Sequence, residues 1–122
     1  MVLDMPSAPP LDDALRAEAE LYLKDAGGWP HGRAVFRENA VRIEFDDNHF
    51  ESGPLCHVEV TAPTYVELPM TFQPRVVELA SAAARDYLAG RVELGARDIA
   101  VAIIDGEGRQ FLVVGSAVVA GV

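Results

Sequence analysis

Three side chains that could bind a metal or act as nucleophiles lie in the stretch DDNHFESGPLCHVEV, residues 46–60: His49, Cys56 and His57. The third histidine of the chain, His31, lies upstream. Structural zinc sites usually contain ligand pairs two to four residues apart. Cys56 and His57 are adjacent instead, and successive side chains of a strand point to opposite faces. We therefore expect Cys56 to lie in the core and His57 on the other face, so that the two do not share one ion.

A different set of side chains in this stretch could still form a metal site. His49 and His57 could bind one ion, with Glu51 or Glu59 as the third ligand. The set His49, His57 and Glu59 defines the alternative function for this chain: a small ligand- or metal-binding protein or an enzyme. It would use a pocket between the sheet and the first helix.

A calcium site, a cysteine nucleophile and an acid–base pair are less well supported by the sequence. A calcium loop that starts at Asp46 is excluded, because Phe50 stands where an oxygen ligand is required. Cys56 could pair with a histidine as a nucleophile, but a buried cysteine on a strand is more often inert. Glu59 and Glu67 are the two carboxyl groups expected to face one another from neighbouring strands, where an acid–base pair needs them. We predict no catalytic residue and no cofactor.

Acidic and aromatic side chains gather in one interval of the sequence. Between Arg42 and Arg75 there is no lysine or arginine. A surface that combines acidic and aromatic residues suits a basic, partly apolar protein partner. The residues predicted to bind this partner are Glu44, Asp46, Asp47, Phe50, Glu51, Glu59, Tyr65 and Glu67.

The amino-acid composition limits which binding partners and which cellular compartment we expect for this protein. The formal net charge of −9 disfavours nucleic acids and anionic membranes, both of which need a basic surface. The single cysteine excludes an internal disulfide, and the first ten residues, MVLDMPSAPP, lack the basic start of a signal peptide. The uncharged segment at residues 111–122 is shorter than the roughly 20 residues that span a membrane. We expect a cytoplasmic protein.

Two helices are predicted. Residues 1–10 are rich in proline and form an extended lead-in, and a domain of residues 11–122 follows. The first helix starts after Pro10 and ends before Gly27, with a broad apolar stripe that could also meet a second chain. The second helix is expected between Pro74 and Gly90. Its buried side would comprise Val76, Val77, Ala80, Ala83, Tyr87 and Leu88.

The strands are predicted from alternating and continuous apolar patterns. The segment RAVFRENAVRIEFD reads as a hairpin with a turn at Asn39, and LCHVEVT and YVELPM read as two further strands. Two apolar runs flank Asp105-Gly106-Glu107-Gly108 and predict a second hairpin. The last strand, residues 111–120, is long and apolar, so we expect that a homodimer could form through it.

The second half of the chain resembles a family of short bacterial domains of unknown function. The resemblance covers residues 67–114: Glu67-Leu68-Pro69 at the end of a strand, an alanine-rich helix, and the hairpin IAVAIIDGEGRQFLVV. It implies a fold and no activity. The order of elements is also similar to that of the small chaperones of type III secretion, which end in a further helix that this chain lacks.

These patterns together predict an α+β fold with one antiparallel sheet of five or six strands and both helices packed on one face. The predicted function is that of a non-enzymatic acidic module that binds another protein, as a chaperone, adaptor or inhibitor does. Its partner would be basic or rich in arginine.

Overall fold

The computed structural model describes residues 7–51 and 53–121. The first six residues of the predicted lead-in fall outside this range, and residues 7–10 belong to no helix or strand. The elements are α1 (Asp13–Leu23), β1 (His31–Arg37), β2 (Ala40–Asp46), β3 (Cys56–Thr61), β4 (Tyr65–Glu67), β5 (Thr71–Phe72), β6 (Pro74–Leu79), α2 (Ala82–Ala89), β7 (Ile99–Asp105), β8 (Gln110–Gly115) and β9 (Ala117–Gly121).

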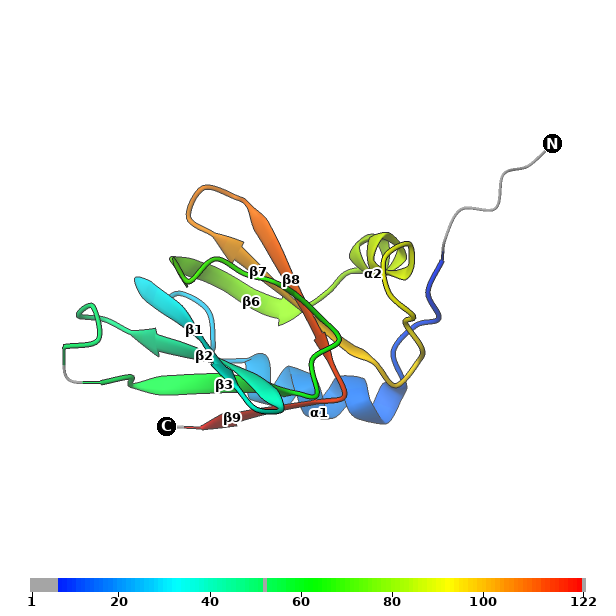
Figure 1. Ribbon diagram of the computed structural model, residues 1–122, viewed down its shortest axis with the longest axis horizontal. Helices are drawn as coiled ribbons and strands as arrows, with labels where there is room; N and C mark the ends of the chain where they lie inside the picture. The colour runs from blue at the N-terminus through cyan, green and yellow to red at the C-terminus, as the bar shows by residue number, and fades with distance from the viewer. Residues whose placement is uncertain (1–6, 52, 122) are drawn as a thin grey trace.

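The strands form two antiparallel sheets, so the predicted α+β class is confirmed (Figure 1). Sheet A has the order β5-β1-β2-β3-β9, and sheet B has the order β4-β8-β7-β6. The chain crosses from sheet A to sheet B and back in the segments 62–64 and 68–70, and again at the single residues Gln73 and Ser116. The prediction of one sheet with five or six strands was wrong, because these single-residue breaks divide long extended segments between two sheets.

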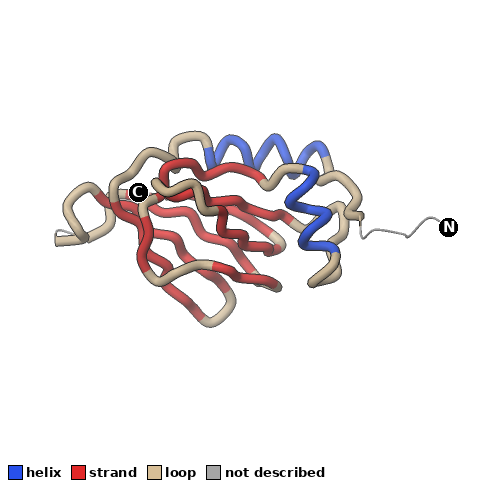
Figure 2. The backbone as a smooth tube through the Cα atoms, turned by 90° about the horizontal axis from the view of Figure 1, so that it is seen from above, coloured by secondary structure: helices blue, strands red, loops and turns tan. Residues whose placement is uncertain are grey.

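Helix α1 completes the main core between the sheets. Its first turn is capped by Asp12, whose carboxylate accepts hydrogen bonds from the amides of Ala14 and Leu15 at 3.1 and 3.2 Å. The buried side carries Ala19 and Leu23. The helix packs on β6 and β9, the outermost strands of sheets B and A, and Figure 2 shows it running along one side of the strands. α1 therefore joins the two sheets where their edges meet.

Strand β7 supplies apolar side chains to two cores at once. Ile99, Val101 and Ile103 face the main core with α1, while Ala100 and Ala102 face a second core with α2. Leu88 of α2 is fully buried there. The two helices thus lie on opposite faces of sheet B, and the prediction that both pack on one face was wrong. A strand that is apolar on both sides must be covered on both sides.

The second predicted helix is shorter than its sequence pattern indicated. Residues 74–79 form β6, which pairs with β7, and the helix begins only after Ser81, whose side chain caps it. Pro74 starts an outermost strand, a position where a proline interrupts no central hydrogen bonding. Tyr87, predicted to be buried, is exposed.

The predicted last strand is divided as well. β8 lies between β4 and β7, so both of its edges are already paired. β9 pairs with β3 on one side only. Residues 112–114 are therefore paired on both sides. The longest free edge in the predicted dimer segment is that of β9.

The predicted hairpin of β7 and β8 is confirmed, and Asp105 organises its turn. The carboxylate accepts hydrogen bonds from the amides of Glu107 and Arg109 and from Nε of Arg109, each at 2.9 Å. Burial acts to raise the pKa of Asp105, but these hydrogen bonds outweigh it and hold the pKa below its ordinary value.

Replacing Gly115 by alanine is expected to destabilise the fold. An added Cβ would lie 2.5 Å from the carbonyl oxygen of Thr61 and 2.5 Å from Val60 Cγ1. Overpacking of this kind costs about 1–3 kcal/mol of the free energy of unfolding, measured by urea denaturation. Gly95→Ala is the control, because its Cβ would meet only Asp98 Oδ2 at an ordinary 3.5 Å. Unchanged stability of Gly115→Ala would contradict the close approach of β8 to β3.

Candidate functional site

Cys56 and His57 point to opposite faces of sheet A, as the sequence predicted. Cys56 is half-buried and packs against the main core, and burial raises the pKa of its thiol. His57 lies on the outer face, where Nη2 of Arg42 is 2.9 Å from its Nδ1 and 3.1 Å from its Nε2. The two side chains therefore diverge from the strand, although both residues line the pocket at the ends of β3 and β9.

The outer face of sheet A holds a ladder of charges created by strand register. Arg33, Glu44 and His57 lie opposite one another on β1, β2 and β3. Nε of Arg33 donates to Oε1 of Glu44 at 2.7 Å, and Nε of Arg42 lies 3.9 Å from Oε2 of Glu44. Only 5% of Glu44 is exposed. Glu44 is thus paired inside the protein rather than presented to a partner, contrary to the prediction.

The surroundings of His57 favour its neutral form. Burial and the positive charge of Arg42 lower its pKa, and these effects outweigh the opposite influence of Glu59 and Glu44. A neutral imidazole can accept a hydrogen bond from the Arg42 guanidinium. His57 therefore serves to fix Arg42 on this face.

The loop at residues 46–53 is built around Asp46. Its carboxylate accepts hydrogen bonds from the amides of Asn48 at 3.1 Å and Phe50 at 2.7 Å. Burial acts to raise the pKa of Asp46, but the backbone hydrogen bonds outweigh it and the pKa lies below its ordinary value. Both bonds go to Oδ2, and Oδ1 is buried without a hydrogen-bond partner among the described residues. Asp46 is thus buried in its own loop rather than presented to a partner, contrary to the prediction.

This loop brings two histidines together. The rings of His31 and His49 have their centroids 3.7 Å apart, and both line an open pocket of about 590 Å³ beside Phe50 and Phe72. His49 and Phe50 have φ angles of 61° and 64°, a left-handed conformation that costs energy in residues with a side chain. The guanidinium of Arg33 lies 4.1 Å above the centre of the Phe50 ring. The contact between His31 and His49 could not be predicted, because it depends on the pairing of β1 with β2, which places His31 opposite Asp46 at the start of the loop.

The predicted metal ligands are not assembled. His57 and Glu59 lie two residues apart on β3, whereas His49 stacks on His31. Within residues 7–51 and 53–121, no three histidine, cysteine, aspartate or glutamate side chains are placed to hold one metal ion. The alternative function that relied on His49, His57 and Glu59 therefore has no common site in this part of the chain.

Tyr65 and Glu67 lie in sheet B, away from the other predicted partner residues. The hydroxyl of Tyr65 donates to Oε2 of Glu67 at 2.5 Å, and this bond, with burial and the nearby Tyr87, raises the pKa of Tyr65 to about 12. Glu59 is on β3 in sheet A. Glu59 and Glu67 are thus not on neighbouring strands, and the predicted pair of facing carboxyl groups was wrong.

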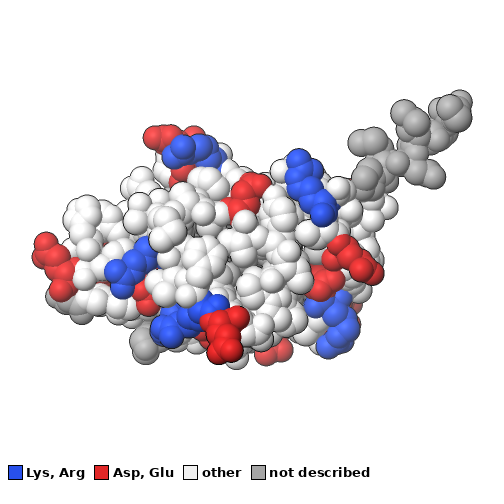
Figure 3. Space-filling view, in the orientation of Figure 1, with Lys and Arg blue, Asp and Glu red and all other residues white. Residues whose placement is uncertain are grey.

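The acidic interval of the sequence does not form one surface. Figure 3 shows acidic and basic side chains in small mixed groups with wide uncharged areas between them. Arginines from β1 and β2 lie beside the acids of sheet A because the strands pair side by side. The eight predicted residues are distributed as follows: Glu44 and Asp46 buried, Asp47 and Glu51 exposed on the loop, Phe50 half-buried beneath Arg33, Glu59 on β3, and Tyr65 and Glu67 on β4.

A groove of about 260 Å³ lies between the second half of α1 and the ends of β3 and β9. Leu21 stands at its rim with 74% of its surface exposed, and the fully buried Phe45 lies among its lining residues. The apolar stripe of α1 hinted at this surface, but the sheet residues that complete it depend on the fold. We call it the α1–β9 groove. Its lining residues are Leu21, Tyr22, Asp25, Ala26, Phe45, Cys56, His57, Val58, Ala120 and Gly121.

The chain matches no family model, no curated protein and no solved structure. The resemblance of residues 67–114 to short bacterial domains therefore stays a prediction. Neither described helix is long and apolar enough to cross a membrane.

Replacing Asp46 by asparagine tests the carboxylate that organises the loop. The folded-state pKa of Asp46 is lowered, so its ionised form stabilises the fold fully above the unfolded pKa of about 3.9. This stabilisation is lost as the pH falls through the lowered folded pKa. We expect Asp46→Asn to have a lower Tm than the wild type at pH 7, with a difference that shrinks below about pH 4.

Circular dichroism melts from neutral to acidic pH measure this difference. Asp47→Asn serves as the control, because Asp47 is exposed on the same loop, and its Tm should follow that of the wild type. A difference between Asp46→Asn and the wild type that stays constant down to about pH 2 would show that ionisation of Asp46 contributes nothing.

Proposed function

We propose that this protein is a non-enzymatic interaction domain that binds an apolar, positively charged segment of another protein in the α1–β9 groove. The observation that carries the proposal is the exposure of Leu21 at the rim of this apolar groove. Covering a leucine side chain contributes about 1.5–3 kcal/mol, so an exposed leucine beside a groove favours an occupant.

The architecture of the groove suits an extended segment. β9 is the last strand of sheet A and pairs with β3 on one side only. Proteins often bind peptides by adding a strand to such an edge while pockets receive alternate side chains. In this groove, α1 supplies one wall and the ends of β3 and β9 supply the other.

Charge favours a basic partner over a second copy of the same chain. The net charge of −9 repels an identical molecule and attracts a positive one. Asp25 lines the groove and is exposed, so it can meet a lysine or arginine of the partner. The acidic partner surface predicted from the sequence is thereby replaced by an apolar groove in an acidic protein.

Selection from a random peptide library displayed on phage tests the proposal. We expect the selected peptides to combine a large apolar residue with lysine or arginine, and to bind more weakly as the salt concentration rises. In calorimetry, Leu21→Lys should weaken the binding of a synthetic selected peptide by about tenfold or more, because it removes an apolar contact and repels a positive charge. Met70→Lys introduces the same charge at a residue that is 67% exposed outside the groove, and it should leave the affinity unchanged.

Three results would contradict the proposal. The library could yield no enriched peptide, or Leu21→Lys and Met70→Lys could weaken the binding of the selected peptide equally. Light scattering could also reveal a wild-type dimer that Leu21→Lys dissociates, which would assign the groove to a second copy instead.

A further inference from the structure

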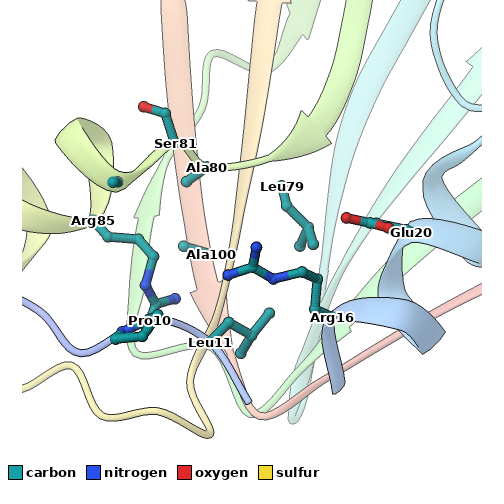
Figure 4. Close-up of a pocket in the computed structure, with 10 residues that line it drawn as sticks. Pro10, Leu11, Arg16, Glu20, Leu79, Ala80, Ser81, Arg85 and Ala100 are labelled. Atoms are coloured by element: carbon teal, nitrogen blue, oxygen red, sulfur yellow. The ribbon is translucent and has the colours of Figure 1, made fainter. Parts of the chain in front are cut away.

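A second concave site, which we call the arginine cavity, lies between the first half of α1, the start of α2 and the segment that precedes α1. Its volume is about 270 Å³, which is below the range of roughly 300–1,000 Å³ typical of pockets for drug-sized molecules. The residues that matter for its chemistry are Leu11, Arg16, Glu20, Leu79, Ser81 and Arg85. Figure 4 shows the side chain of Arg16 extending from α1 toward that of Arg85.

The two arginines of this cavity lack acidic partners. The ion pairs found among the described residues, at 4.0 Å or less, involve Arg33, Arg42 and Arg109, but neither Arg16 nor Arg85. The chain has 19 acidic and 10 basic residues, so carboxylates for pairing are abundant. Glu20 lines the same cavity but forms no ion pair with either arginine among the described residues. The two guanidinium groups repel each other, and an anion would relieve that repulsion.

Arg85 is held rigidly in place. Only 6% of it is exposed. Its N–H groups donate to the carbonyl oxygens of Pro9, Gly95 and Asp98 at 2.8–3.3 Å. These hydrogen bonds use four of the five N–H groups, and the second N–H on Nη1 has no acceptor among the described residues.

Burial lowers the pKa of Arg85, and the positive charge of Arg16 adds to this effect while Asp98 opposes it. The carboxylate of Asp98 itself accepts a hydrogen bond from the amide of Gly95 at 2.6 Å. Backbone carbonyl groups thus hold a buried positive charge that no acidic side chain neutralises at contact distance.

The remaining walls complement an anion that carries a short apolar tail. Ser81 caps α2 by accepting a hydrogen bond from the amide of Ala84 at 3.2 Å, which leaves its hydroxyl proton free to donate. The positive end of the α2 dipole lies at the same place. Leu11 and Leu79 form an apolar wall, and Glu20 disfavours a second negative charge at its side of the cavity.

We propose that the arginine cavity binds a small organic anion, with a carboxylate or phosphate group against Arg16 and Arg85 and a short apolar tail against Leu11 and Leu79. This site is independent of the α1–β9 groove, because none of its lining residues belongs to that groove.

Titration of the ¹⁵N-labelled protein with butyl phosphate and with pentanoate, which carry the same four-carbon tail, tests the proposal by NMR. We expect saturable shifts of the amide signals of Arg16, Ser81 and Ala82 with at least one of the two anions. Butanol and butylammonium, which share the tail but lack the negative charge, should produce none. The anion that binds more tightly identifies the headgroup, because the two compounds differ only there.

Arg16→Gln is the decisive variant because Arg16 is exposed and its loss should not impair folding. We expect it to weaken binding of the anion by about tenfold while the Tm of the free protein stays unchanged. Arg75→Gln removes the same charge from an exposed arginine on β6 that does not line the cavity, and it should bind as the wild type does.

The proposal would be overturned by any of three results. Neither anion might give a saturable shift at the amides around the cavity. Butanol could shift the same signals to the same extent. Arg16→Gln and Arg75→Gln could also weaken binding equally, which would mean that the anion responds only to the overall charge of the protein.

Discussion

The fold depends on the need to cover strand β7 on both faces. Its side chains alternate between two cores, with isoleucine and valine toward α1 and sheet A, and alanine toward α2. No single layer of helices can satisfy such a strand, so the chain surrounds sheet B with different elements on its two faces. The small alanines pack with Ala84 and Leu88 of α2, while the larger residues fill the space between the sheets.

Helix α1 takes part in this packing and also lines both proposed sites. Its buried side chains join the outermost strands of the two sheets, so its remaining surface lies beside the places where the sheets end. Arg16 and Glu20 of the helix line the arginine cavity, whereas Leu21 of the helix and Asp25, which follows its end, line the α1–β9 groove. One structural helix therefore presents two chemically different surfaces, one polar and one apolar.

Local patterns in the sequence were sufficient for the elements whose partners are close in the chain. The two hairpins and the opposite orientations of Cys56 and His57 follow from alternation and turn residues. The strand at residues 74–79 could not be predicted, because Pro74 and the alanines that follow also fit the start of a helix. Only the pairing with β7 makes this segment a strand.

The candidate sites were less predictable than the elements, because their residues are brought together by pairing between distant segments. Glu44 looked free in the sequence, yet strand register places it against Arg33. Arg16 and Arg85 have no pattern in common, and they meet only because α1 and α2 both adjoin the segment around Leu11. The apolar stripe of α1 was visible, but the sheet wall that turns it into a groove was not.

The pairing of β3 with β9 has a consequence for synthesis on the ribosome. Thr61 lies opposite Ala117, so one edge of β3 stays open until residues 117–121 have been made. β1, β2 and β3 can form a meander early, but its outer strand then presents unpaired backbone groups and the apolar Val58 and Val60 to the cell. The nascent chain is thus open to mispairing at this strand edge while residues 62–116 are being made.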